Sequence, residues 1–434
     1  MKMKFIRRLL DKTEEKLFAP GKPFSIFYPF FEAANTFFFT PDLKTTGKCH
    51  VRDCNDFKRM MIAVCYALIP CVIMGMYNVG YQTNVLLEQN GLTASTGWHG
   101  WILNGLNQLF AMCNTWLPSF LQINVYDPSR LNILGNLIHG AVYFIPLYAV
   151  TMIVGLGWEI LFAMVNKHDV NEGFFVTGLI FPLTLPPAVP LWQVAVAITF
   201  GVIFGKEIFG GTGRNFLNPA LVARAFLFFA YAGQISGDRV WTTAGVDGIA
   251  KATPLSYATS SDMVTGGVHG LHSAGYNIMD SFIGLVPGSF GETSTVACLI
   301  GMVFLLFVGV ASWRIVASMA VGGMGLATLF WYFGGQSNAA MGIGPVWHFV
   351  LGGFAFGMVF MATDPVTAAM TRTGQYLYGL LVGALVIVIR VLNPAYPEGT
   401  MLVILFGNCC APLIDYMVVQ SNIERRQNRI AGRP

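Results

Sequence analysis

The sequence predicts an all-α polytopic membrane protein with about ten transmembrane helices. Of its 434 residues, 54% are hydrophobic and only 11% are charged, and the mean hydropathy is +0.58. Soluble proteins carry about 25% charged residues. A soluble core of this length has no room for so much apolar surface, so lipid must surround much of the chain.

Ten apolar runs are read as membrane spans, since a helix needs about 20 residues to cross a bilayer. They lie at 60–80, 131–163, 173–190, 192–209, 217–234, 293–311, 315–333, 346–363, 376–392 and 400–418. The transmembrane domain is therefore predicted at 60–418, between a cytoplasmic N-terminal arm at 1–59 and a basic tail at 419–434.

The placement of lysine and arginine predicts the orientation. With the N-terminus inside, twenty of the 26 basic residues face the cytoplasm, and only Arg130, Arg239 and Lys251 face outward. This excess follows the positive-inside rule and predicts that both termini are cytoplasmic. The first residues lack the apolar core of a signal peptide, so the mature protein is expected to begin there. Because the basic residues flank apolar spans, we expect no nucleic-acid binding.

Three segments outside the spans have features of their own. Residues 81–130 contain an apolar stretch near 101–121 that predicts an interfacial helix. Residues 235–292 form an outer loop rich in glycine, serine and threonine. Seven phenylalanines between 24 and 39 predict either a membrane-surface anchor or an aromatic wall beside a lipophilic ligand.

Several cofactor classes have no matching motif. Cys49 and Cys54, around His50 and Asp53, look metal-like, but no second pair completes a tetrahedral set. The chain shows no nucleotide-binding loop, no paired histidines for haem and no cysteine set for an iron–sulfur cluster. We therefore expect no metal site and no dinucleotide-binding domain.

Helix-breaking residues interrupt several spans. GGTGRNFLNPALVAR (210–224) opens the fifth span, MATDPVTAAMTRTG (361–374) closes the eighth, and LNPAYPEG (392–399) separates the last two. Irregular backbone at membrane depth is tolerated only where it is buried in protein or lines a polar cavity. The first two segments occupy comparable places in the two halves, both at the cytoplasmic side. We therefore expect two inverted repeats, a common plan for transport proteins.

Acidic residues in apolar surroundings are costly and need a reason. Glu207 follows Lys206 and is predicted to form a structural salt bridge with it. Glu159, Asp364 and Asp415 are candidates for either function or structure. From the residues alone, the chain is a transporter-like or electron-transfer membrane protein with an ion or small-molecule path.

Long stretches of the chain resemble the B subunits of bacterial Na+-translocating NADH:quinone oxidoreductases. They are HVRDCNDFKRMM (50–61), KHDVNEGFFVTGLIFPLTLPP (167–187), FGKEIFGGTGRNFLNPALVARAFLFFAYAGQISGD (204–238), PGSFGETST (287–295), LGGFAFGMVFMATDPV (351–366) and RVLNPAYPEGTMLVILFGNCCAPLID (390–415). The resemblance implies an inner-membrane component of a six-subunit sodium pump, with NADH oxidised on another subunit. The corresponding proteins of Rnf complexes share the general pattern.

The resemblance implies an FMN joined by a flavin transferase to the hydroxyl of Thr253, on the outer side of the membrane. The matching segment begins at Asp247. Ala250 and Lys251 replace a small hydroxyl residue and a glycine or serine of the usual motif, which bears on recognition by the transferase. Without the resemblance, Thr253 is an ordinary loop threonine before Pro254.

The resemblance also implies a riboflavin at Asn215 and Asn218. Amide side chains both donate and accept, which suits the edge of a flavin ring. Either asparagine can instead cap the broken fifth helix.

Ubiquinone reduction is implied at the Gly-Gly-x-Trp-Glu region, here Gly155-Leu156-Gly157-Trp158-Glu159. Leu156 replaces the second glycine of the family, so the wall of the pocket is expected to differ. A glycine lets a flat headgroup approach the backbone, and Glu159 can donate a proton. The phenylalanine-rich arm, with Glu32, then reads as part of a quinone vestibule.

An ion path is implied along GGFAFGMVFMATD. Phe356 and Phe360 lie four residues apart on one helical face, and Asp364 lies one turn further on. Two rings above a carboxylate would gate a cation site, and Asp415 is a further acid of this path. Ordinary helix packing is the alternative. We interpret the chain as part of a redox-driven Na+ pump, and the rival interpretations are an Rnf-type electron-transfer subunit and a passive channel or transporter of the same fold.

Overall fold

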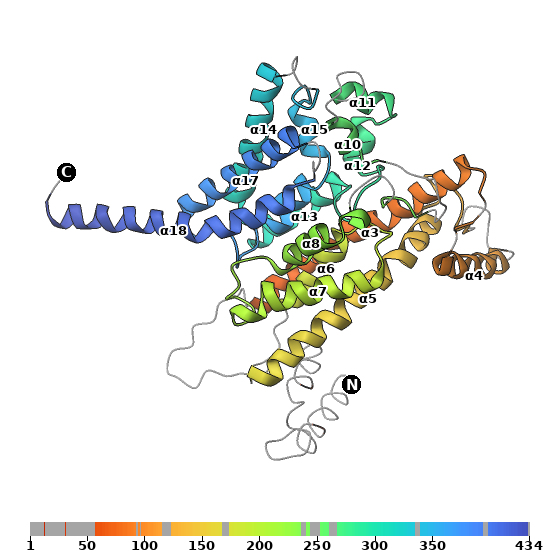
Figure 1. Ribbon diagram of the computed structural model, residues 1–434, viewed down its shortest axis with the longest axis horizontal. Helices are drawn as coiled ribbons and strands as arrows, with labels where there is room; N and C mark the ends of the chain where they lie inside the picture. Colours follow the sequence, from red (N-terminus) through yellow and green to blue (C-terminus); the bar gives the residue numbers. More distant parts are fainter. Residues whose placement is uncertain are drawn as a thin grey trace.

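The computed structural model describes residues 57–92, 94–95, 97–114, 123–166, 173–235, 240–243, 252–259, 267–334, 339–393 and 398–432, with Thr13 and Phe31 in addition. The predictions made for Glu32, Cys49, Cys54, Asp247, Ala250 and Lys251 fall outside these residues. Every regular element within the described residues is a helix, which confirms the predicted all-α class (Figure 1).

Each of the ten predicted spans contains helix, but in the described part of the chain only six helices are long and apolar enough to cross a membrane. These are α3 (Phe57–Gln89), α5 (Ile133–Asn166), α7 (Leu191–Gly205) with the 3₁₀ turn η4 (Glu207–Phe209), α14 (Trp313–Gly334), α17 (Arg372–Leu392) and α18 (Thr400–Ile430). Three apolar helices are shorter, namely α6 (Phe174–Leu183), α8 (Pro219–Ala230) and α13 (Thr295–Val308). The remaining predicted span, the eighth at 346–363, is α15 (Pro345–Val350), α16 (Phe354–Phe356) and the π-helix η5 (Gly357–Met361).

Two glycines explain why the span predicted at 346–363 is broken. Gly352 has a φ of +65°, a left-handed conformation that side chains other than glycine rarely adopt. A side chain at Gly353 would meet the carboxylate of Glu292 at 2.8 Å. The backbone therefore leaves the helix between α15 and α16 and passes close to an acidic side chain from another segment.

Polar residues fix where three of the helices begin. Asn218 caps α8 by accepting a hydrogen bond from the backbone N–H of Ala220 at 3.0 Å, and Pro219 occupies the first helical position. Ser294 caps α13 and Thr371 caps α17 in the same way. The Asn-Pro break noted in the sequence is thus a helix start.

The ten helices fall into two halves, α3 to α8 and α13 to α18. In each half, two helices are followed by a short or broken helix and then by two further helices. Because five is an odd number, the first helix of the second half crosses the bundle in the opposite direction to the first helix of the first half. An inverted repeat requires this. The connection 206–218, between α7 and α8, corresponds in order to 393–399, between α17 and α18. In this order 361–371 follows η5 and precedes α17, and the prediction that 210–224 and 361–374 lie at the same side agrees with the contact of Asn218 with Asp364.

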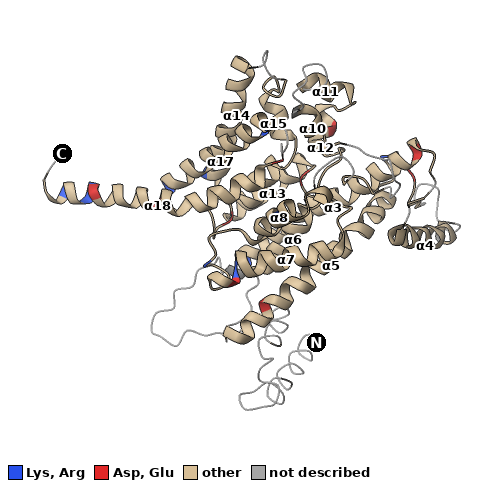
Figure 2. Cartoon of the chain, in the orientation of Figure 1, with Lys and Arg blue, Asp and Glu red and all other residues tan. Residues whose placement is uncertain are grey.

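Smaller elements surround the bundle. The predicted interfacial helix is α4 (Gly97–Asn114), which stands apart at the right of the view beyond the end of α3 (Figure 1). In the loop predicted to lie outside, α10 (Pro254–Thr259) and α11 (Gly267–Ser273) share a small core with α15, and α12 (Ile278–Ile283) follows them. The turn α9 (Ala232–Ile235) extends α8, and α18 continues to Ile430 as an exposed, charged helix. Charges are sparse elsewhere along the bundle (Figure 2).

Candidate functional site

A cleft of about 690 Å³ lies at the end of the bundle where α3 begins. Its walls come from α3, α6, the α7–α8 connection, the end of α13 and the turn after η5. Four predicted site residues line it, namely Asn215, Asn218, Phe360 and Asp364. The structure thus brings the predicted riboflavin residues and part of the predicted ion path to one space, which we call the Asp364 cleft.

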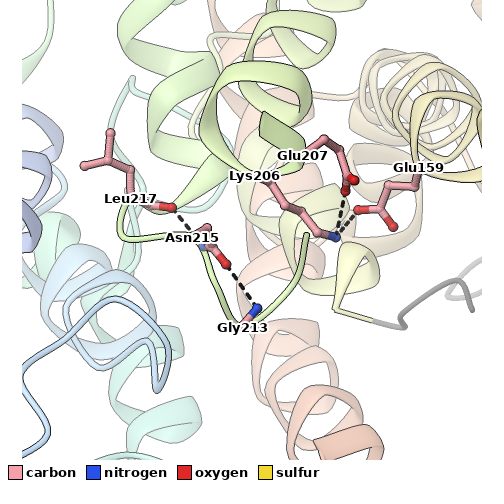
Figure 3. A network of polar contacts seen from close by, with 6 residues as sticks. All are labelled: Glu159, Lys206, Glu207, Gly213, Asn215 and Leu217. Carbon is pink, nitrogen blue, oxygen red and sulfur yellow. Dashed lines mark hydrogen bonds and ion pairs between the residues drawn. The ribbon is translucent and has the colours of Figure 1, made fainter. Parts of the chain in front are cut away.

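The α7–α8 connection forms one wall of this cleft and is shaped by glycines. Gly210, Gly211 and Gly213 have φ values of +103°, +89° and +88°, which favour glycine. The Asn215 side chain then ties the turn together. Its Oδ1 accepts from the backbone N–H of Gly213 at 3.2 Å, and its Nδ2 donates to the carbonyl of Leu217 at 2.9 Å (Figure 3).

Asn218 connects the cap of α8 to Asp364. Its Nδ2 lies 3.4 Å from Asp364 Oδ2, while its Oδ1 caps the helix, so the capping alternative is confirmed for this asparagine. Asp364 also accepts hydrogen bonds from Thr367 Oγ1 at 2.8 Å and from the backbone N–H of Val366 at 3.2 Å. Burial raises the pKa of Asp364, although both of these hydrogen bonds lower it.

Phe356 and Phe360, which were predicted to gate the ion path, lie next to each other between the cleft and the interior of the protein. Their ring centroids are 5.1 Å apart. Phe360 lines the cleft, whereas Phe356 is fully buried beneath it. The ring of Phe360 also occupies the space beside Gly301 of α13, where a Cβ would meet it at 2.6 Å. The expected pairing of the rings is confirmed, and the π-helix that carries Phe360 had no signal in the sequence.

Asp415 stands apart from the residues that line the cleft. Its carboxylate accepts from the backbone N–H of Met370 at 2.7 Å and of Thr371 at 2.9 Å, and from the Thr371 hydroxyl. Thr371 is itself the cap of α17. Asp415 therefore joins α18 to the start of α17.

Glu159 of α5 is buried and forms an ion pair with Lys206, at the end of α7 (Figure 3). Lys206 also lies 4.0 Å from Glu207, so the pair expected from sequence adjacency exists, but it is the longer of the two. The same lysine lines the Asp364 cleft. Lys206 therefore stands between Glu159 of the predicted quinone region and the predicted riboflavin residues.

Gly155, the other residue of the predicted quinone region, faces α6. An added Cβ would overlap the ring of Phe174, which is 1% exposed. Two residues on, Gly157 is exposed and has no atom within 4 Å of its Cβ position. Gly155 thus permits the close packing of α5 on α6, and the open glycine on α5 is Gly157.

Thr253 lies at the opposite end of the bundle. It precedes α10, accepts from the backbone N–H of Ser256 at 3.3 Å and is only 6% exposed. It lines a cavity of about 360 Å³ together with Glu292 and Glu398. We call this space the Thr253 cavity. Asn78, near the far end of α3, donates to a carbonyl of its wall at 2.7 Å.

Charges near Thr253 were not assigned to a site from the sequence. Burial raises the pKa of Glu292 to about 7, helped by Glu398 and opposed by Arg224 and Arg390. An adjoining cavity of about 340 Å³ contains Arg224, Glu292 and Glu398. The sequence signal for this cluster of charges was that Arg224 and Arg390 lie inside apolar spans. Arginines in such surroundings require acidic partners.

Comparison with known proteins finds relatives along nearly the whole chain. The model of the NQR2, RnfD, RnfE family matches residues 44–424. The chain is 51% identical over 426 residues to the B subunit of the Na(+)-translocating NADH-quinone reductase of Stutzerimonas stutzeri. It is 52% identical over 426 residues to the same component from Azotobacter vinelandii and 50% identical over 430 residues to that from Klebsiella pneumoniae. Each alignment covers 98% of this chain and 99% of the relative.

Proposed function

Because the chain belongs to the NQR2, RnfD, RnfE family, we propose that it is a membrane subunit of a bacterial sodium-translocating NADH–quinone reductase. It passes electrons from a covalent FMN through riboflavin to ubiquinone and couples this to Na+ export, while NADH is oxidised on another subunit. The observation that carries the proposal is the meeting of Asn215, Asn218, Phe360 and Asp364 in one cleft. Both termini are cytoplasmic in this proposal, with Thr253 on the outer side.

The Thr253 cavity contains the threonine that the proposal uses for attachment of FMN, while the charged residues that line it are the acids Glu292 and Glu398. Arg224 and Arg390 provide positive charge nearby, and Glu292, with a pKa of about 7, can hold a proton beside a phosphate. FMN supplies the electron chemistry when bound, and this chain supplies its attachment and the charges around its phosphate.

The Asp364 cleft fits riboflavin in polarity, because small-molecule pockets usually contain a few polar groups among apolar ones. The hydroxyl of Thr212 lines the cleft and has no hydrogen-bond partner among the described residues. The Thr212 hydroxyl and the Asn218 amide would together hold the polar edge of the flavin. Asp364 then provides the carboxylate of a cation site, and the rings of Phe360 and Phe356 separate it from the interior.

For ubiquinone, the approach is from the lipid-facing side of α5. Gly157 leaves that face open, and Glu159 lies two residues further on the buried side of the helix. Residues two apart on a helix point to different faces, so a headgroup over Gly157 would lie across α5 from the buried pair of Glu159 and Lys206, which supplies a proton-binding group and a positive charge.

Flavin attachment gives the sharpest test. The complex is expressed with its flavin transferase, and this chain is examined on a denaturing gel for flavin fluorescence. We expect a fluorescent parent, a dark Thr253→Ala variant and a fluorescent Ser256→Ala control, since Ser256 is an exposed hydroxyl in the helix that Thr253 precedes. Fluorescence that persists in Thr253→Ala would remove the covalent site from this residue.

An Rnf-type electron-transfer subunit is the second candidate, since the matching family model also includes RnfD and RnfE. Quinone-dependent NADH oxidation by the purified complex separates the two, because the Rnf-type subunit lacks quinone reduction. A passive channel of the same fold would contain no flavin. Flavin released from the complex by acid therefore excludes this candidate, and its absence would favour it.

A further inference from the structure

We propose that Lys206 is a ligand-binding residue of the Asp364 cleft and links the charge of the bound flavin to Glu159. The inference rests on the proposed function, since it assigns a role toward the riboflavin. Lys206 and Glu159 are 47 residues apart in the chain and belong to different helices. Their contact therefore joins the predicted flavin site to the predicted quinone region.

The backbone of Lys206 is held firmly where α7 ends. Its N–H donates to the carbonyl of Val202, and its carbonyl accepts from the N–H groups of Phe209 and Gly211, each at 3.2 Å. The preceding residue, Gly205, packs against the start of α8, where a Cβ would lie 3.2 Å from Pro219 Cα. These contacts fix the position from which the lysine side chain extends.

The ammonium group lies in a largely buried and acidic environment. The side chains of Lys206 and Glu159 are 5% and 4% exposed, and Glu207 lies at 4.0 Å. A buried charge needs a close counter-charge, and Glu159 provides it. An ammonium has three N–H donors, and the hydrogen bond to Glu159 uses one of them. At 4.0 Å Glu207 is beyond hydrogen-bonding distance, and Lys206 also lines the Asp364 cleft.

On the cleft side, the ligand proposed here is a neutral ring with a carbonyl and N–H edge that gains electron density on reduction. A nearby cation stabilises the more negative form. Lys206 would therefore favour the reduced flavin, while Asn218 and Thr212 hold its edge. Because the coupling of two sites is reciprocal, more negative charge in the cleft weakens the hold of Lys206 on Glu159.

The test uses the purified complex and two readouts, the amount of acid-extractable riboflavin and its midpoint potential. Lys206→Gln removes the charge, Lys206→Arg keeps it, and Glu159→Gln removes its counter-charge. Arg214→Gln is the matched control, since it removes one exposed positive charge from the same connection. We expect Lys206→Gln to lower the reduced-to-oxidised ratio of the flavin about tenfold, roughly 59 mV for one electron. Glu159→Gln should raise the reduced-to-oxidised ratio. Lys206→Arg and Arg214→Gln should leave this ratio near the parent value.

Loss of riboflavin from Lys206→Gln, with riboflavin retained in Arg214→Gln, also supports binding by the lysine. If Lys206→Gln does not assemble, the shift in Glu159→Gln decides alone. A parent complex with riboflavin whose potential is the same in Lys206→Gln, or in Glu159→Gln, overturns the inference and leaves the proposed function intact. A parent complex without extractable riboflavin overturns the proposed flavin site itself.

Discussion

Replacing Gly155 by alanine tests whether this glycine serves helix packing or the quinone. The new Cβ would lie inside the ring of Phe174, which is 1% exposed and belongs to the main hydrophobic core. Overpacking of a core costs ~1–3 kcal/mol. We expect Gly155→Ala to lose this much free energy of unfolding, because neither α5 nor the ring has free space to move into.

A second substitution shows where the loss arises. Phe174→Leu makes room at the contact and by itself costs ~1–2 kcal/mol of apolar burial. In the double variant the overlap is gone, so its loss should be smaller than the sum of the two single losses by about 1 kcal/mol or more. The control is Gly157→Ala, whose Cβ has no atom within 4 Å, so that it should not lower the stability.

Thermal or denaturant unfolding of the purified complex, followed by tryptophan fluorescence, measures these differences, and the KM for ubiquinone is determined on the same samples. We expect Gly157→Ala to raise KM without a loss of stability. An unchanged stability in Gly155→Ala, or a loss that Phe174→Leu does not reduce, would refute the packing explanation and return Gly155 to direct contact with the quinone.

Three other substitutions test the Asp364 cleft and its surroundings. Because burial raises the pKa of Asp364, protons compete with Na+ at a higher pH than at an ordinary aspartate. The apparent Na+ affinity should therefore fall on acidification through this pKa. Asp364→Asn should weaken Na+ activation and remove the pH dependence. Na+ titrations of turnover at several pH values measure both effects. Asn218→Ser keeps a capping oxygen but loses the amide that reaches Asp364, so riboflavin content should drop while the melting temperature stays within a few degrees. Asp415→Ala removes an acceptor for two backbone N–H groups and should cost ~1–3 kcal/mol in unfolding experiments; an unchanged stability with impaired Na+ activation would instead place Asp415 in the ion path.

The membrane class, the helix positions and several helix starts were predictable because they depend on composition and on near neighbours in the chain. A run of about 20 apolar residues is stable in lipid wherever it packs. An asparagine before a proline, as at Asn218-Pro219, satisfies the first N–H groups of a helix from within the same turn. The predicted contact of the Phe356 and Phe360 rings also follows from their local spacing.

The partners of buried groups were not predictable in this way, because they are set by which helices pack together. Adjacency in the sequence favoured Glu207 as the partner of Lys206, whereas the closer carboxylate belongs to Glu159 on another helix. The close approach at Gly353, next to the break at Gly352, depends on Glu292, which is distant in the sequence. Local chemistry alone thus determines that the chain enters a membrane and where its helices begin. Which polar groups meet in the two cavities is decided only by the tertiary packing, since a buried charge takes whatever counter-charge the neighbouring helices bring within reach.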